Sequence, residues 1–225
     1  MNNLSSITLP VLAERIHCGA RAVLLVRHAE RPPLPANDLT FGRDLPLTAQ
    51  GVSDAARFGR TVARHLGDRN VPVISGGNRR CIETAFHMFR GMGVDWEDER
   101  CAVNADPYLG GRSYYLGDVR ERMELADSGN YLENLNAYFL TGLQRGFNPL
   151  HPSTALFVGH LLWHYGAQVL VGITHDLNVA CFLAGNGVTA SFTPDTWPHF
   201  LDAAVLLAFP DGHDECFFLE RINNA

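Results

Sequence analysis

Arginine, histidine and carboxylate side chains gather at three places in this sequence, and together they could bind a phosphate group. Residues 27–31 read Arg-His-Ala-Glu-Arg, residues 79–80 are two arginines, and residues 175–176 are His-Asp. The planar guanidinium group of arginine donates paired hydrogen bonds to phosphate oxygens. Arginines held close together are costly unless an anion joins them, so the ligand we expect is a phosphate group.

Each of the three places follows a short apolar run that reads as a buried strand. These runs cover residues 22–26, 71–75 and 168–173. In open α/β sheets, ligands bind beyond the carboxyl ends of the strands. We therefore expect one edge of the sheet to collect the side chains of Arg27, His28, Arg31, Arg79, Arg80, His175 and Asp176.

Helical spacing of apolar residues separates these strands. The first helix is predicted within residues 45–68, with Thr48 as its N-cap. Further helices are predicted at 79–91, 131–146, 152–167 and 177–185, and two apolar runs around Asp211 and Gly212 predict a terminal hairpin. This alternation predicts a three-layer α/β/α sandwich around a mainly parallel sheet. We expect a single domain over residues 1–225, with a short inserted cap at about 92–150.

Composition excludes several kinds of function. All 18 basic residues are arginine, so a P-loop lysine and a Schiff-base lysine are excluded. The formal net charge of −6 argues against a nucleic-acid partner, and no apolar run approaches the ~18 residues of a membrane span. The five cysteines are widely spaced and odd in number, as in a protein with reduced thiols. We expect a cytoplasmic protein with no nucleic-acid or membrane partner.

The motifs resemble those of the histidine phosphatase superfamily, which has the phosphoglycerate-mutase-like fold. Arg27 to Pro33 is similar to the R-H-G-x-R-x-P motif of its acid-phosphatase branch, with Ala29 in place of glycine. Arg80 to Ala85 fits R-x-x-x-[ST]-A, and Leu47 to Gly51 fits the helix start L-T-x-x-G. The His-Asp pair after the third strand is also typical of the acid-phosphatase branch. All the motifs stand in the family's order.

The resemblance implies a metal-independent phosphomonoesterase that acts through a phosphohistidine and needs no cofactor. His28 would be the nucleophile, and Asp176 would protonate the leaving group and then activate water, with His175 beside it. In the family's other branch the acid lies in the inserted region, where Asp106 could serve instead. The phosphate would be held by Arg27, Arg31, Arg80 and His175. The expected partners are a small phosphorylated metabolite as substrate and inorganic phosphate as product.

Two other functions fit the same residues. A phosphomutase or phosphotransferase would share the phosphate ligands and pass the group to a second hydroxyl instead of water. A phospho-ligand binding module would keep the ligands without turnover. The natural substrate and the oligomeric state are not predicted.

Several neighbouring residues have simpler interpretations. Arg79 lies four residues before Glu83, so we expect it to form a surface ion pair. His160 and His164 have the spacing of two metal ligands on a helix, but without a third ligand we expect packing or surface roles. The residues that could line a substrate pocket or simply pack a loop are Tyr108, Arg112, Tyr114 and Tyr115, and the segment from Trp197 to His199 could also face the pocket.

Overall fold

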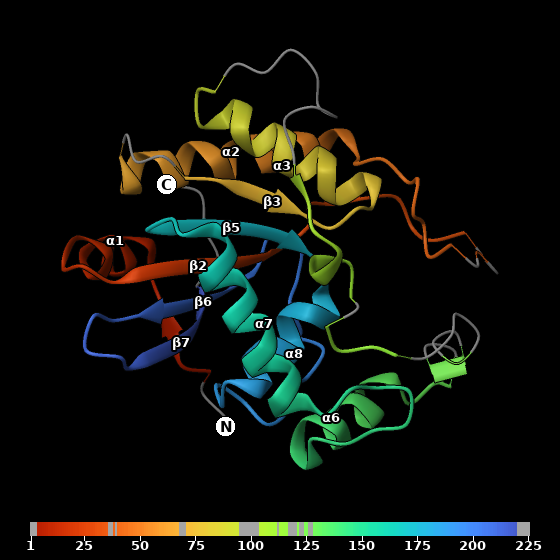
Figure 1. The fold of residues 1–225 in the computed structure, drawn as a ribbon. Coiled ribbons are helices and arrows are strands. Elements are labelled where there is room, and N and C mark those ends of the chain that lie inside the picture. Colours follow the sequence, from red (N-terminus) through yellow and green to blue (C-terminus); the bar gives the residue numbers. More distant parts are fainter. Residues whose placement is uncertain are drawn as a thin grey trace.

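A seven-stranded sheet lies at the centre of the computed structural model (Figure 1). The strand order is β1-β7-β6-β2-β5-β3-β4. The strands are β1 (Ser6–Ile7), β2 (Arg21–Arg27), β3 (Val73–Ser75), β4 (Asn104–Ala105), β5 (Val169–Thr174), β6 (Ala203–Ala208) and β7 (Asp214–Leu219). The structure describes residues 4–35, 38, 40–67, 71–94, 104–111, 113–116, 121, 124–125 and 128–219, without the side chains of Asn104 and His164.

The sheet is mixed but mainly parallel, as predicted. β2, β5, β3 and β4 pair in parallel, and so do β1 and β7. Only β6 runs the other way, pairing antiparallel with both β2 and β7. The amino end of β6 therefore lies at the same edge as the carboxyl ends of β2 and β5.

Helices cover both faces of the sheet, which gives the three-layer sandwich that the sequence predicts (Figure 1). One face packs against α1 (Leu9–His17), α2 (Ala49–Leu66) and α3 (Arg79–Gly91), and the other against the 3-10 helix η1 (Pro107–Gly110), α6 (Tyr131–Thr141), α7 (Leu150–Tyr165) and α8 (Asp176–Gly185). None of the helices in the described part combines the length and apolar character that crossing a bilayer requires.

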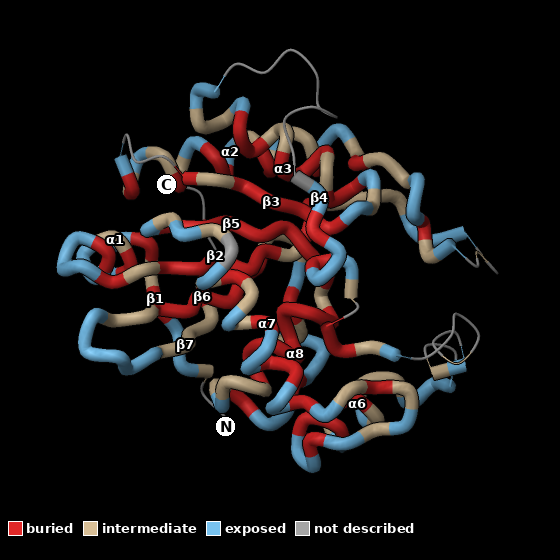
Figure 2. The backbone as a smooth tube through the Cα atoms, viewed as in Figure 1, coloured by how far each residue is buried: buried red, intermediate tan, exposed pale blue. Residues whose placement is uncertain are grey.

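The central strand β2 is buried on both sides (Figure 2). Leu24 and Val26 belong to the core beneath α2 and α3, whereas Val23 and Leu25 belong to the core beneath α7 and α8. Side chains alternate between the two faces of a strand, so a continuous apolar run fills both cores at once. This burial fixes the position of Arg27, where β2 ends.

The first helix after the motif at residues 27–31 is anchored to that motif. Thr48 caps α2 as predicted, because its hydroxyl accepts from the backbone N–H of Gly51 at 3.0 Å. The backbone N–H of Thr48 donates to the carbonyl of Glu30 at 3.0 Å. A Cβ atom at Gly51 would collide with that same carbonyl oxygen, so only glycine allows this approach.

The predicted strands, helices and terminal hairpin are all present, with boundaries that differ by a few residues. The short elements β1, α1, β4 and η1 were not predicted. In residues 92–150 the structure describes β4, η1 and α6, and α6 packs its buried side chains into the same core as α8. The description of this stretch as an inserted cap stays a prediction.

Candidate active site

The predicted convergence of strand ends is present in the structure. The backbone N–H of His28, just after β2, donates to the carbonyl of Thr174 at the end of β5, at 2.9 Å. Asn78 caps α3 after β3, and its side-chain nitrogen lies 3.3 Å from His175 Nε2. From the antiparallel side, the N–H of Leu201 donates to the carbonyl of Arg27 at 3.2 Å. Four strands thus deliver residues to one edge.

His28 is a buried histidine whose protonation state is set by its surroundings. Its side chain is 3% exposed. Nδ1 lies 2.8 Å from the carbonyl of Ala29, and the Nε–H of Arg80 donates to Nε2 at 3.1 Å. The carbonyl requires a proton on Nδ1, so the lone pair lies on Nε2. Burial, with Arg80 and Arg27 nearby, lowers the pKa of His28 to about 3, against the opposing effects of the Ala29 carbonyl and Asp176.

This pKa predicts that the protein loses stability in acid partly through His28. Unfolded histidine titrates near 6.5, so between pH 6.5 and 3 unfolding takes up a proton. The free energy of unfolding should therefore fall as pH falls. Between pH 7 and 4, the free energy of unfolding measured by urea titration should fall on the order of 2–3 kcal/mol less in His28→Asn than in wild type. His17→Asn, at an exposed position, is the control. If wild type and both variants lose the same free energy of unfolding in acid, His28 is not the cause of the loss.

Arg80 joins the two histidines. It is 6% exposed, and its three guanidinium nitrogens reach different partners. Besides the bond from Nε to His28, Nη1 donates to the carbonyl of Gly42 at 2.6 Å, and Nη2 lies 3.4 Å from Nδ1 of His175. The rings of His28 and His175 meet edge to face at 5.4 Å between centroids. The guanidinium of Arg80 is therefore a positive charge fixed between the imidazole rings of His28 and His175.

Arg27 and Arg31 form the other side of the cluster, with Asp176 as counter-charge. Arg27 Nη2 lies 3.2 Å from Asp176 Oδ2, and burial together with Arg27 lowers the pKa of Arg31. Among the described residues, the buried Nε atoms of Arg27 and Arg31 have no hydrogen-bond partner. Buried donors normally have acceptors, so these two atoms suit an anionic ligand. With Arg80, three positive charges face one negative charge, a net of +2 that matches a phosphate dianion.

Asp176 is the first residue of α8 and is 34% exposed at its side chain. Burial raises its pKa, but Arg27, the backbone N–H of Leu177, His28 and the indole of Trp197 outweigh burial and hold the pKa below its ordinary value.

Asp106 is held in a separate buried cluster. Its Oδ2 accepts from His160 Nε2 and from the Tyr165 hydroxyl, both at 2.7 Å, and Oδ1 accepts from the N–H of Tyr108 at 2.8 Å. Burial raises the pKa of Asp106, and these bonds together lower it below its ordinary value. His160 thus has a carboxylate partner, whereas the side chain of His164 lies outside the described residues.

Other residues of the predicted motifs bond to the backbone beside His28 and Arg80. The hydroxyl of Thr84, four residues after Arg80, accepts from the backbone N–H of Ala29 at 3.0 Å and donates to the Arg80 carbonyl at 2.6 Å. It therefore ties the two motifs together. Glu83 accepts from Arg79 Nε at 2.6 Å, which confirms the predicted ion pair. The guanidinium of Arg79 thus contacts Glu83 on α3, while that of Arg80 contacts the histidines.

The segment from Trp197 to His199, which the sequence indicates could face the pocket, does contact this cluster, and Phe200 and Leu201 beside it were not singled out from the sequence. The carbonyl of Pro198 accepts from Arg27 Nη1 at 2.6 Å, and the ring of Phe200 lies 4.4 Å from Arg27 Cζ and 5.6 Å from the His28 ring. Leu201 adopts a left-handed φ of 64° between this segment and β6. Nothing in the sequence marks such a turn, because glycine is the usual residue there. Asn78 likewise carries no signal in the sequence that marks it as a site residue.

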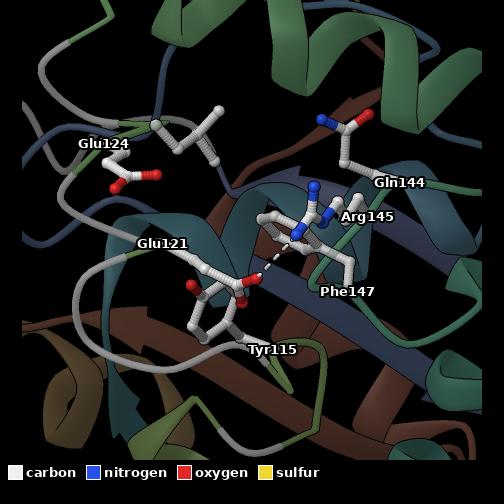
Figure 3. Close-up of a pocket in the computed structure, with 7 residues that line it drawn as sticks. Tyr115, Glu121, Glu124, Gln144, Arg145 and Phe147 are labelled. Atoms are coloured by element: carbon white, nitrogen blue, oxygen red, sulfur yellow. Dashed lines mark ion pairs between the residues drawn. The ribbon is translucent and has the colours of Figure 1, made fainter.

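The aromatic residues of the inserted region have different environments. Tyr114 is fully buried in the core and bonds to Thr154 at 3.2 Å, so it packs the loop. Tyr115 instead borders a cavity of about 240 Å³, seen in Figure 3, where its ring lies near Phe147 and the ion pair of Glu121 and Arg145. This cavity contains none of the residues of the arginine–histidine cluster. Arg112 lies outside the described residues.

Comparisons with known proteins give the same family as the motifs. A model of the histidine phosphatase superfamily (branch 1) matches residues 23–101, and no curated protein matches the sequence. A mycobacterial glucosyl-3-phosphoglycerate phosphatase is 16% identical, with a TM-score of 0.54 over 89% of this chain and 98% of that one. Its complex with inorganic phosphate is 16% identical, with a TM-score of 0.53 over 88% and 95%. Bacillus stearothermophilus YhfR is 18% identical, with a TM-score of 0.52 over 86% and 94%.

The family match covers the part of the chain that carries the first two motifs, and the solved structures share the fold. Over residues 23–101 the chain is similar to the histidine phosphatase superfamily, and its fold is that of solved phosphatases. The matching model is that of branch 1, so the preference for the acid-phosphatase branch is not confirmed.

Proposed function

We propose that this protein is a metal-independent phosphomonoesterase that hydrolyses a small phosphorylated metabolite through a phosphohistidine on His28. The observation that carries the proposal is the state of His28: a neutral imidazole of fixed tautomer, buried beside Arg80 and Arg27. A neutral lone pair is what a nucleophile needs, and the surrounding cations suit the charge of a phosphoryl group.

In this proposal the phosphate is held by Arg27, Arg31, Arg80 and His175. The unpartnered Nε atoms of Arg27 and Arg31 supply two donors. Arg80 and His175, joined at 3.4 Å, supply more from the other side. Guanidinium groups take the part that a metal ion takes in other phosphoryl-transfer enzymes, which is to stabilise the equatorial oxygens.

The first chemical step forms the bond between phosphorus and Nε2 of His28 and breaks the ester P–O bond. Asp176 gives its proton to the departing alkoxide. The Ala29 carbonyl, at 2.8 Å from Nδ1, stabilises the positive charge that develops on the imidazole. In the second step the Asp176 carboxylate takes a proton from water, the water oxygen bonds to phosphorus, and the P–N bond breaks to release inorganic phosphate and neutral His28.

A small phosphate ester is favoured as substrate for two reasons. One similar structure is a glucosyl-3-phosphoglycerate phosphatase, and one was solved with inorganic phosphate. The net charge of about +2 at the cluster also matches the single phosphate of a monoester. A cytoplasmic location is part of the proposal and rests on the odd number of widely spaced cysteines.

The test is hydrolysis of p-nitrophenyl phosphate in excess chelator. Wild type should turn over, and phosphate or vanadate should inhibit competitively, because both would occupy the arginine cluster. A panel of sugar and metabolite phosphates then ranks substrates by kcat/KM. Binding of vanadate without any turnover would instead indicate a binding module, and transfer to a second hydroxyl without release of phosphate would indicate a mutase.

A further inference from the structure

The segment just before β6 contacts the proposed acid directly. The indole Nε1–H of Trp197 donates to Asp176 Oδ2 at 3.3 Å. Arg27 Nη2 lies 3.2 Å from the same oxygen. The other carboxylate oxygen, Oδ1, accepts from the backbone N–H of Leu177 at 2.9 Å. The two oxygens of Asp176 therefore have different surroundings, one facing a cation and an N–H donor, the other facing a single N–H.

This asymmetry decides where a proton on Asp176 resides. A proton on Oδ2 would face the Arg27 guanidinium and the Trp197 N–H, both of which carry positive charge toward that oxygen. A proton on Oδ1 meets only the N–H of Leu177. The protonated acid therefore carries its hydrogen on Oδ1, and Trp197 and Arg27 stabilise charge on Oδ2.

Trp197 is itself fixed in place. Its backbone N–H donates to the carbonyl of Thr193 at 2.8 Å. Its ring meets the edges of Phe192 and of Tyr131 on α6, with centroids 5.6 and 6.1 Å away. The indole N–H therefore has a defined direction before any substrate binds.

Resting on the proposed function, we propose that Trp197 is a positioning residue for general acid catalysis: its indole N–H holds Oδ2 of Asp176 beside Arg27 and leaves the transferable proton on Oδ1. Two nearby residues of the segment support the same ion pair, because the Pro198 carbonyl accepts from Arg27 and the Phe200 ring lies under its guanidinium. Residues 197–200 thus act on both members of the Arg27–Asp176 pair.

Removing the indole donor should raise the pKa of Asp176. A donor to a carboxylate stabilises its charged form, so loss of the donor favours protonation. The other titratable groups coupled to this carboxyl are Arg27, Arg31, His28 and Cys181, and they are unchanged by the substitution. Trp197→Phe keeps an aromatic ring against Tyr131 and Phe192. The expected rise is about half to one pH unit, the size of one ordinary hydrogen bond.

The experiment measures the pKa of Asp176 in two ways, by NMR titration and by kinetics. Carboxyl carbon NMR titration of ¹³C-aspartate protein, with the signal assigned by Asp176→Asn, gives the pKa in wild type and in Trp197→Phe. The pH profile of the phosphoryl-transfer step, measured in single turnovers with a sugar phosphate and with p-nitrophenyl phosphate, gives the kinetic counterpart. Trp163→Phe is the matched control, because Trp163 is 86% exposed on α7. If Trp197→Phe does not fold, Trp197→Leu also lacks the donor and is titrated instead.

We expect the Asp176 signal to titrate higher in Trp197→Phe and not in Trp163→Phe. The descending limb of the sugar-phosphate profile should shift to higher pH by the same amount. The p-nitrophenyl phosphate profile should keep its position. An unchanged Asp176 pKa, or two substrate profiles that move together, would overturn the role of Trp197. A wild type that hydrolyses neither ester would refute the proposed function, and the NMR titration would still decide the Trp197–Asp176 contact.

Discussion

His28→Ala should abolish turnover of every phosphate ester while leaving the protein folded. His28 is the proposed nucleophile, so no phosphohistidine can form without it. Loss of a nucleophile costs roughly 10⁴-fold or more in kcat, as in other enzymes with a covalent intermediate. The measurement is hydrolysis of p-nitrophenyl phosphate, with far-UV circular dichroism to confirm folding. Wild type rapidly quenched without acid should also carry an acid-labile phosphoryl group that the variant lacks.

His17→Ala is the matched control for this prediction. His17 lies exposed near the end of α1, away from the arginine cluster, so its removal should leave kcat unchanged. Vanadate should still bind to His28→Ala, because Arg27, Arg31, Arg80 and His175 remain. Substantial activity in His28→Ala, or a phosphoenzyme that survives the substitution, would remove His28 from the nucleophile role.

The positions of Arg27, His28 and His175 could be predicted because they follow from local rules. An apolar run that is buried on both faces predicts a parallel strand, and parallel strands end at one edge of the sheet. Thr48 could be predicted as a cap because a hydroxyl at a helix start satisfies free N–H groups. These inferences need only the residues of one element and the common direction of its neighbours.

The sequence indicates that residues 197–199 could face the pocket, but the contacts of the segment from Trp197 to Leu201 do not follow from local rules. The terminal hairpin was predicted, but the place of β6 between β2 and β7 depends on pairing across the whole chain. It is this antiparallel placement that brings Pro198 and Phe200 onto Arg27. Leu201, at a φ of 64°, also gives no sequence signal for the turn that makes the approach.

The state of Asp106 was equally beyond local reasoning. Its partners His160 and Tyr165 lie on α7, more than fifty residues away in the chain. The sequence showed a carboxyl in the inserted region and two histidines at metal-like spacing, but not that one of those histidines would bond to that carboxyl. Long-range side-chain pairs of this kind follow from the packing of helices on the sheet. The sequence therefore favours Asp176 as the acid, with Asp106 as the alternative, and does not show which contacts Asp106 makes.

Asp176→Asn should separate the two candidate acids. An asparagine cannot donate a proton to a leaving group, and general acid catalysis contributes typically about 10²–10⁴-fold. Sugar alkoxides need that proton, whereas p-nitrophenolate departs with little protonation. The variant should therefore slow the phosphoryl-transfer step for a sugar phosphate by about that factor and slow p-nitrophenyl phosphate far less. Single-turnover kinetics on both esters, at a series of pH values, measures this step directly.

The pH dependence of sugar-phosphate turnover provides a second test of Asp176 as the acid. In the free enzyme Arg27 and the other donors hold the pKa of Asp176 low, against the effect of burial. A bound phosphate dianion adds negative charge beside the carboxyl and raises that pKa again. Turnover of sugar phosphates by wild type should therefore be highest in acid and fall as pH rises through the pKa of the substrate complex. In Asp176→Asn this descending limb should disappear.

Asp106→Asn is the matched comparison, since it makes the same change at the other carboxyl. Asp106 accepts three hydrogen bonds in a buried cluster, so the substitution should lower the free energy of unfolding. The ratio of the phosphoryl-transfer rates for the two esters should stay unchanged. If Asp176→Asn slows both esters equally while Asp106→Asn selectively slows the sugar phosphate, the proton comes from Asp106. In that case the ion pair of Asp176 with Arg27 serves to orient the arginine, and Trp197 does not contact the acid.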